Sequence, residues 1–390
     1  MIARIIIPIV LLLIISDVYV DRHLLRHTRR NRKAKRTAWF IQSIFMLAYS
    51  ISLASTKSFA PQDTDWLNWY LLLLGLWALP KFIFTVCSFL GWQHCEFHHT
   101  KTNWGNPIGA TIGFLTAMIT VYGYTLGFSK IEVRHVVFYS KDLPDNFDGY
   151  RIVQFSDAHV GTYSASREHI LKAAVDSINK QKADLVVFTG DLQNMTPSEI
   201  VPHEALLSCL RGKDGVVSVL GNHDYAYYLD ADDKTREENC KKMVQIQKNM
   251  GWKLLMNENI RIRRNNDSIV VAGMEYEGNS KKVPNKGDIK KTLDGITTKG
   301  AFILMLQHDP TSWESDILPH STAQLTLSGH THAGQIKIFG WSPASLLYKQ
   351  WGGMFYIGDR AINVSTGLGG FAPFRFGCPG EIVVVTLKKT

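Results

Sequence analysis

Cysteine is scarce in this chain of 390 residues, which contains only Cys87, Cys95, Cys209, Cys240 and Cys378. No pair has the C-x-x-C spacing, and the five form no obvious disulfide framework. We expect free thiols, with one disulfide among the last three as the alternative if that part of the chain lies outside the cytoplasm. A C-x-x-C redox pair and a cysteine-rich zinc motif are therefore excluded.

An excess of charge of one sign is absent from the last 260 residues, which carry 30 Lys and Arg against 29 Asp and Glu. The first 130 residues carry 13 against 5, so the net charge of +9 belongs almost entirely to the N-terminal region. A nearly neutral second part argues against a nucleic-acid partner, and we expect none. Internal repeats and low-complexity linkers are also lacking.

Long apolar runs are confined to residues 1–130, where we predict four transmembrane helices. They cover roughly Ile2–Val20, Ala38–Ser55, Trp66–Leu90 and Pro107–Phe128. Each is close to the ~20 residues that cross the hydrocarbon core of a bilayer. The first run could instead be a signal peptide, but it has no small-residue cleavage site before Asp21, and its basic residues follow the apolar run. That order favours a membrane anchor.

The stretch 21–37 between the first two predicted helices is rich in Lys and Arg, which predicts a cytoplasmic loop. Four crossings would then place everything after about Ser129 on the extracytoplasmic side, and we expect an integral protein of a bacterial inner membrane. The third connection, residues 91–106, contains His94, Cys95, His98 and His99. Their spacing matches no standard zinc motif, so a polar loop beside the membrane is favoured over a metal site.

Residues 131–390 alternate short apolar runs with helical patterns, which predicts an α/β domain with buried sheets. Residues 166–181 and 230–251 are the clearest helices, and the later part is richer in strands.

Polar side chains able to bind metal follow five of the apolar runs. They are Asp157 and His159, Asp191, Asn222 with His223 and Asp224, His308, and His330 with His332. In open α/β sheets, sites form beyond the carboxyl ends of the strands, so we expect the five loops to converge on one cleft. In an extended segment His330 and His332 would point to the same side. Mixed oxygen and nitrogen ligands suit Zn, Mn or Fe. Because the ligands outnumber the needs of one ion, the sequence favours two divalent or trivalent metal ions bridged by a carboxylate.

The ordered motifs D-x-H, G-D, G-N-H-D, a single His and G-H-T-H resemble those of the calcineurin-like metallophosphoesterases, in particular a membrane-anchored bacterial branch. The resemblance covers about residues 131–390 and implies two facing mixed β-sheets flanked by helices. It implies that Asp157, His159 and His332 hold the first metal. It implies that Asn222, His308 and His330 hold the second, with Asp191 as the bridge. His223 would act on the transition state or the leaving oxygen without binding metal, and Asp224 would orient His223.

Two segments of the chain depart from that branch. Ala333 stands where glycine is common, and Glu275 and Glu277 replace an Asp-rich stretch. The methyl group of Ala333 is a minor change. The glutamates leave the residues around the substrate undefined but do not affect the metal ligands.

Residues 339–356 are rich in apolar and aromatic side chains, which are typical either of a lip that contacts the membrane or of a packed hairpin. Arg375 could contact a substrate phosphate or pair with an acidic residue. The sequence as a whole predicts a membrane-anchored phosphatase that cleaves phosphate ester or pyrophosphate bonds, of lipid-linked or cell-envelope substrates. The alternatives are a pyrophosphatase of the UDP-diacylglucosamine type, acting on a lipid precursor, and a non-catalytic metal-binding sensor or scaffold.

Overall fold

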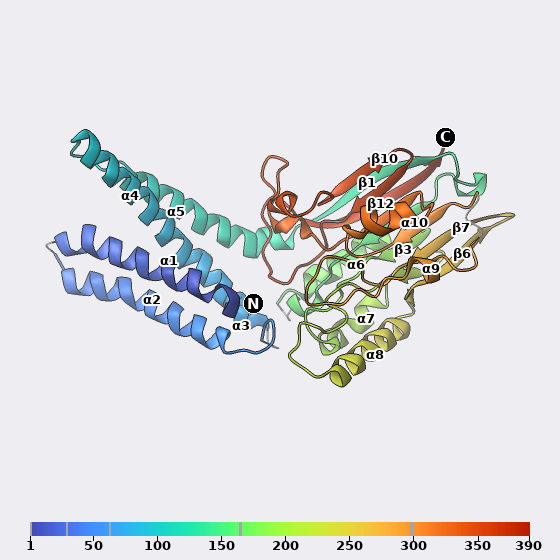
Figure 1. Cartoon of the computed structure of the whole chain (residues 1–390), viewed down its shortest axis with the longest axis horizontal. Helices are drawn as coiled ribbons and strands as arrows, with labels where there is room; N and C mark the ends of the chain where they lie inside the picture. The colour runs from blue at the N-terminus through green and yellow to red at the C-terminus, as the bar shows by residue number, and fades with distance from the viewer. Residues whose placement is uncertain (1, 29, 62–63, 164–165, 297–299) are drawn as a thin grey trace. The chain divides into compact units, whose positions relative to one another are not determined.

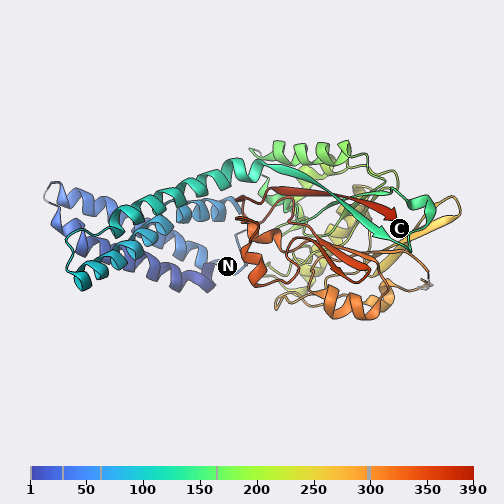
Figure 2. The same ribbon diagram turned by 90° about the horizontal axis from the view of Figure 1, so that it is seen from above.

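The computed structural model describes residues 2–28, 30–61, 64–163, 166–296 and 300–390. It divides into two compact units, Met1–Leu126 and Gly127–Thr390, whose internal architectures are drawn in Figures 1 and 2. Arg29 in the basic stretch and residues 62–63 in the second connection lie outside the described residues.

In the described part of the first unit, all regular elements are helices. Its α-helices are α1 (Ile2–His23), α2 (Arg32–Ala54), α3 (Thr64–Leu73), α4 (Leu79–His98) and α5 (Gly105–Tyr122). A π-helical turn joins α3 to α4, and another extends α5 to Gly127. Among the described residues, three helices are long and apolar enough to cross a membrane: Arg32–Ala54, Thr64–His98 and Gly105–Gly127. The first predicted segment is also helical, as α1.

The connections on the basic side are shorter than the sequence predicted. Helix α1 continues to His23 and α2 begins at Arg32, so the expected loop 21–37 is largely helical. Helix α4 likewise continues to His98, which places His94 and His98 one turn apart with ring centroids separated by 4.4 Å. Propensity alone does not end a helix at the last apolar residue, because Arg, Lys and Gln are good helix formers.

Three glycines let α5 approach α4 closely. Gly105, Gly109 and Gly113 recur every fourth residue, and a methyl group added at Gly109 would lie 2.9 Å from the Cβ of Cys87. A repeat of small residues at this spacing is a common interface between transmembrane helices.

An ion pair lies inside the helical unit. The Nζ of Lys81 lies 3.3 Å from an oxygen of Asp17, and it also donates to the Ser43 hydroxyl and the Trp39 carbonyl. All three ammonium protons thus have acceptors, as a buried charge requires.

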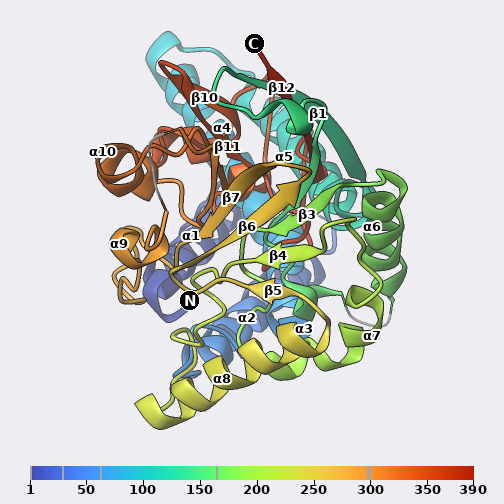
Figure 3. The same cartoon turned by 90° about the vertical axis from the view of Figure 1, so that its right-hand side faces the viewer.

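The second unit contains two six-stranded sheets (Figure 3). The first has the order β1 (Ile131–Ser140), β12 (Gly380–Lys389), β2 (Arg151–Phe155), β3 (Leu185–Phe188), β4 (Val216–Ser218) and β5 (Lys253–Leu254). The second has the order β10 (Gly353–Ile357), β11 (Arg360–Val364), β9 (Leu325–Ser328), β8 (Ile303–Leu306), β7 (Asp267–Gly273) and β6 (Glu258–Arg264). Both sheets mix parallel and antiparallel pairs, which confirms the predicted fold.

Alternation along the strands builds the layers. Ile152 of β2 faces the other sheet and packs with Leu304 and Leu325, whereas Val153 faces outward and packs with α6 (Glu168–Lys180). Successive side chains of a strand point to opposite faces. Helices α7 (Glu204–Leu207) and α8 (Asp233–Asn249) lie on the side of the first sheet, and α9 (Ile289–Thr292) and α10 (Leu318–His320) on the side of the second (Figure 3).

Two strands that the sequence pattern did not single out, β5 and β6, lie at sheet edges. In β6, Ile260 and Ile262 pack toward the core while arginines alternate with them. Charged residues are common on edge strands, where they disfavour pairing with other chains.

Arg264 of β6 joins the two sheets through Asp184, whose carboxylate lies 2.7 Å from the guanidinium and also accepts from Lys213 and the Arg151 amide. Burial alone would raise the pKa of Asp184, but these hydrogen bonds outweigh it and hold the pKa below its usual range.

We expect Asp184→Asn to lower stability by about 1–3 kcal/mol, because Arg264, Lys213 and the Arg151 amide lose a buried, charged acceptor. Because the pKa of Asp184 is lower in the folded than in the unfolded chain, its carboxylate stabilises the fold at pH values above the unfolded-state pKa of ~4. This contribution to the free energy of unfolding is lost as the pH falls through the folded-state pKa. The difference in Tm from wild type, measured in detergent, should therefore shrink in acid. The control is Asp359→Asn, which removes an exposed ion pair with Lys141; an equal loss in both variants would contradict the assignment.

All five cysteines are free thiols. The alternative of a disulfide among Cys209, Cys240 and Cys378 is therefore wrong for this structure.

Candidate metal centre

The metal-capable side chains come from the ends of five strands. In the first sheet β2, β3 and β4 are parallel neighbours, and in the second sheet β8 and β9 are parallel neighbours. Because parallel neighbours end at the same edge of a sheet, the loops that follow them converge. The structure brings together Asp157, His159, Asp191, Asn222, His223, His308, His330 and His332.

Five of these residues have left-handed backbone conformations. The φ angles are 51° for Asp157, 46° for His159, 62° for Asp191, 74° for His330 and 50° for His332. Such conformations are uncommon outside glycine and cost of order 1–3 kcal/mol each, and they concentrate at functional sites. The sharp turns after the strands aim these side chains back into the cleft.

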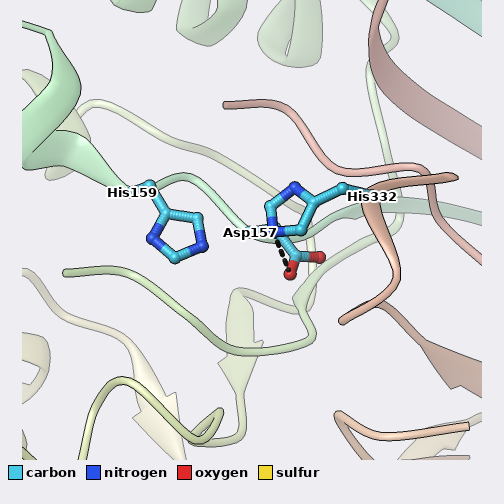
Figure 4. A group of neighbouring side chains, drawn as sticks. All are labelled: Asp157, His159 and His332. Carbon is cyan, nitrogen blue, oxygen red and sulfur yellow. Dashed lines mark ion pairs between the residues drawn. The ribbon is translucent and has the colours of Figure 1, made fainter. Parts of the chain in front are cut away.

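The first cluster comprises Asp157, His159 and His332 (Figure 4), with potential ligand atoms all within 4.8 Å of one another. The Nε2 of His332 lies 3.3 Å from an oxygen of Asp157. The Nδ1 of His159 lies 3.0 Å from the amide oxygen of Asn194 and donates to it, which leaves the Nε2 with a free lone pair. That Nε2 is buried, has no hydrogen-bond partner, and lies 3.7 Å from Asp191.

The second cluster surrounds the Nε2 of His308. Asp191 Oδ2 lies 3.2 Å from it, Asn222 Oδ1 lies 3.1 Å from it, and His330 Nδ1 lies 3.2 Å from it. The other ring nitrogen of His308 donates to the Thr189 carbonyl at 2.7 Å. Asp191 therefore faces both clusters.

This donor set fits a metal pair. With its Nδ1 donating to Thr189 and no proton on Nε2, the state that metal binding requires, His308 presents a lone pair at Nε2, where an amide oxygen and a carboxylate oxygen also present lone pairs. Several lone pairs at one buried point repel one another unless a cation lies among them. At the first cluster, the buried Nε2 of His159 has no hydrogen-bond partner, and a cation there would satisfy its lone pair.

The electrostatics of the cleft agree with this. Burial lowers the pKa of His159 to about 3, and it also lowers the pKa of His332, so both imidazoles are neutral as metal ligands must be. Burial alone would lower the pKa of His308, but the carboxylate of Asp191 outweighs it and raises the pKa to about 10. Asp191 thus draws positive charge to this point.

His223 is held differently from the expectation. Its Nδ1 lies 2.6 Å from the carbonyl oxygen of Asn194. The carboxylate of Asp224 instead accepts from the backbone amides of Gly221, Asp191 and Leu192. The expectation that Asp224 orients His223 is therefore wrong in this structure: Asp224 fixes the loop that carries Asp191, and Asn194 orients His223.

Arg375 also differs from both expectations. It is fully buried, and its guanidinium donates to the carbonyls of Thr366, Gly367, Gly369, Cys378 and Pro379. Within the described residues, no acidic side chain forms an ion pair with it. Its role is to fold the segment before β12 beside Asp157, because Gly367 lies against the Cβ of Asp157.

Four further residues hold the site, and none of them is among the site residues expected from the sequence, although Tyr348 belongs to the aromatic segment 339–356. Asn194 binds two of the histidines, and Asp309 lies 3.4 Å from His330 Nε2. Tyr348 lies 3.1 Å from the same nitrogen, and Tyr228 stacks on His223 at 4.3 Å. Asn194 follows Asp191 by three residues and Asp309 follows His308 directly, so their proximity to motif residues was the available signal.

We expect Asn194→Ala to weaken metal binding by roughly 10- to 100-fold, because loss of a partner that orients a ligating histidine typically costs this much. Asn194→Asp keeps an acceptor for His159 and is the matched control. Competition with a chelator measures both affinities. Equal affinities in the two variants would show that the His159 contact is unimportant.

Comparisons with known protein families support the assignment of this cleft as a metal centre of a phosphoesterase. The family described as calcineurin-like phosphoesterase matches residues 150–334. The family described as probable calcineurin-like phosphoesterase, transmembrane domain, matches residues 3–128.

Three relatives illustrate the likeness. The uncharacterized metallophosphoesterase YkuE of Bacillus subtilis is 32% identical over 281 residues, which are 69% of this chain and 90% of that protein. A transmembrane protein with metallophosphoesterase domain from Danio rerio is 29% identical, over 70% of this chain and 61% of its own length. A protein of the same name from Bos taurus is 25% identical over 97% of this chain and 87% of its own length.

The second unit carries the motifs, fold and clustered ligands of this family, whose members use a dinuclear metal centre, and the first unit matches the transmembrane domain that accompanies it. The chain therefore belongs to the calcineurin-like metallophosphoesterases and is a metal-dependent phosphoesterase of the membrane.

Proposed function

We propose that the phosphoesterase domain hydrolyses phosphate ester or pyrophosphate bonds of lipid-linked or cell-envelope substrates. The observation that carries the catalytic part is the convergence on His308 Nε2 of three further ligand atoms within 3.2 Å. The membrane unit supports the lipid part, since it keeps the domain close to lipid phosphates.

In this proposal Asp157, His159 and His332 hold one metal ion, which is Mn, Fe or Zn. Asn222, His308 and His330 would hold a second, and Asp191 would contribute to both sites. When bound, the pair supplies positive charge for the phosphoryl oxygens and lowers the pKa of a water molecule.

The chain's own groups handle the leaving oxygen. Because the Nδ1 of His223 donates to the Asn194 carbonyl, its Nε2 is the nitrogen that remains for proton transfer. Tyr228 and Phe371 stack around this imidazole, with ring centroids 4.3 and 5.8 Å from it, and limit its rotation.

The test is metal analysis of the purified full chain together with hydrolysis of bis-p-nitrophenyl phosphate, p-nitrophenyl phosphate and lipid phosphates. We expect two metal ions per chain and hydrolysis that a chelator abolishes. A chain that binds metal but hydrolyses none of these substrates would support the sensor alternative, and a chain with neither bound metal nor hydrolysis would refute the proposal. Hydrolysis confined to nucleotide-lipid pyrophosphates would support the lipid-precursor alternative.

We propose that the domain lies on the extracytoplasmic side, and that the membrane is a bacterial inner membrane. The support is the basic stretch 21–37 followed by four apolar segments. Arg26 and Arg36 both pair with Asp21, so part of this charge is neutralised. A C-terminal tag accessible only after permeabilisation of the inner membrane would contradict this orientation.

A further inference from the structure

The exposed apolar side chains of the second unit gather in one loop. Of the ten large apolar or aromatic side chains that are exposed in the described part of residues 127–390, five lie within residues 338–347. They are Ile338, Phe339, Trp341, Leu346 and Leu347. Leu346 and Leu347 are 76% and 81% exposed, and Phe339 is fully exposed. Soluble surfaces rarely gather this much apolar area without a partner. We call residues 338–347 the apolar loop.

The apolar loop has a defined structure. The Ile338 amide donates to the Trp341 carbonyl and the Trp341 amide to the Ile338 carbonyl, so Phe339 and Gly340 form a tight turn with φ angles of 49° and 85°. The following 3-10 turn, Pro343–Leu346, is capped by the Ser342 hydroxyl, which accepts from the Ala344 amide. The bulky tip is thus held out rigidly instead of folding back onto the core. The remainder of the aromatic segment, Gly353–Ile357, pairs with β11 as strand β10.

The apolar loop borders the metal centre. Leu347 precedes Tyr348, whose hydroxyl lies 3.1 Å from His330 Nε2. In the middle of the loop, Ser342 donates to the carbonyl of Ala333, the residue after His332. His330 and His332 keep 16% and 17% of their side-chain surface exposed, whereas the other ligand side chains of the first cluster are buried.

The connection to the membrane unit enters at this same edge. Strands β2, β3 and β4 run toward the metal centre, and β12 is antiparallel to β2, so β12 begins at that edge. Strand β1 is parallel to β12 and pairs Ile131 with Gly380, as Figure 1 shows for the two strands side by side. Glu381 in turn donates to the Gly367 carbonyl beside Asp157. The domain therefore receives its connection where its ligands lie.

That connection is short. The last candidate span ends at Gly127 and β1 begins at Ile131. Four residue steps of at most ~3.8 Å keep the start of β1 within about 15 Å of the span's end. The first residue of β1, at the edge that carries the metal centre, is thus tied to the last candidate span by a connection of this length.

We propose that the apolar loop inserts into the lipid bilayer and places the opening of the metal centre at the level of the lipid headgroups. Aromatic and leucine side chains at the tip enter the acyl region, as in other interfacial segments. Lys337, beside the loop, lies over the Trp351 ring and is suited to anionic headgroups. The consequence that membrane lipid phosphates are the preferred substrates rests on the proposed function; the insertion itself does not.

Insertion is tested without reference to activity. The full chain, with Cys87, Cys95, Cys209 and Cys240 replaced and the buried Cys378 retained, carries Phe339→Cys labelled with an environment-sensitive fluorophore. It is reconstituted in phosphatidylcholine–phosphatidylglycerol vesicles. The matched control is Ile357→Cys, an exposed apolar position at the end of β10 remote from the ligands. We expect blue-shifted emission and quenching by lipids brominated in their acyl chains only at position 339. Equal emission and quenching at the two positions would overturn the proposal.

A second experiment measures the consequence for hydrolysis. The double variant Phe339→Asp, Leu347→Asp should lose at least tenfold in rate on a lipid phosphate presented in vesicles and should keep its rate on bis-p-nitrophenyl phosphate. Ile357→Asp should keep both rates. If the double variant retains the lipid rate, the loop does not place the opening at the headgroups. If wild type hydrolyses neither substrate, the proposed function fails while the fluorescence result still decides insertion.

Discussion

Replacing Asp191 by asparagine should abolish the metal pair and reduce hydrolysis of bis-p-nitrophenyl phosphate by about 10³-fold or more. Asp191 is the carboxylate that faces both clusters, at 3.7 Å from His159 Nε2 and 3.2 Å from His308 Nε2. Burial would raise its pKa, but the imidazoles of His308 and His223 outweigh this and hold it well below the usual range, so the group is a permanent anion. An amide of the same shape removes the charge that holds two cations together, and loss of a single stabilising group in an active site already costs ~10²–10³ in rate.

Metal content by mass spectrometry and the hydrolysis rate measure this effect in the same sample. The control is Asp309→Asn, a buried carboxylate of the same cleft that lies 3.4 Å from the outer nitrogen of His330 and also accepts from Tyr276 and Thr311. Its loss should cost roughly 10- to 100-fold. An Asp191→Asn variant that keeps two metal ions would refute the bridging role.

Replacing His223 by alanine should lower kcat by about 10²–10⁴-fold and leave two metal ions bound. This magnitude is typical of a general acid or base. The ring of His223 is close enough to His159 and Asp191 to be a ligand by distance alone. Its orientation by the Asn194 carbonyl, and the completeness of both clusters without it, favour the proton-transfer role.

The leaving group separates the two roles. A p-nitrophenolate leaves with little help from an acid, so the loss on bis-p-nitrophenyl phosphate should be smaller than the loss on an alkyl phosphodiester. His330→Ala is the comparison, because a lost ligand should reduce metal content and both rates together. Equal losses on the two esters, accompanied by loss of metal from His223→Ala, would make His223 a ligand.

Much of the fold was predictable because buried strands leave a strong local pattern. Continuous apolar runs such as Leu185–Phe188 and Ile303–Leu306 predict strands correctly. The edge strands β5 and β6 carried too weak a signal, since β5 has two residues and β6 alternates isoleucine with arginine. In an edge strand, many side chains face solvent or form ion pairs, so the composition of the strand resembles that of a loop.

The wrong predictions for Asp224 and Arg375 have one origin: the hydrogen-bond partner of a polar side chain depends on tertiary contacts. Asp224 stands next to His223 in sequence, yet it binds the amides that begin the Asp191 loop. Arg375 follows an exposed-looking aromatic stretch, yet its guanidinium is enclosed by carbonyls. Segment 339–356 combines the two alternatives left open, an exposed loop followed by a strand.

The sequence by itself determined which residues are available for metal chemistry and that each follows a strand, because strand periodicity and the order of the motifs are local properties of the chain. It also determined that the first 130 residues are apolar enough for a membrane. The tertiary structure decided how the five loops are joined: Asn194 links His159 to His223, and Asp224 holds Asp191. It also decided where the membrane connection meets the domain. Because β12 is antiparallel to β2 and β1 is parallel to β12, β1 begins at the edge where the ligands lie. These contacts join residues far apart in sequence, and no local pattern encodes which distant carbonyl or amide a side chain will meet.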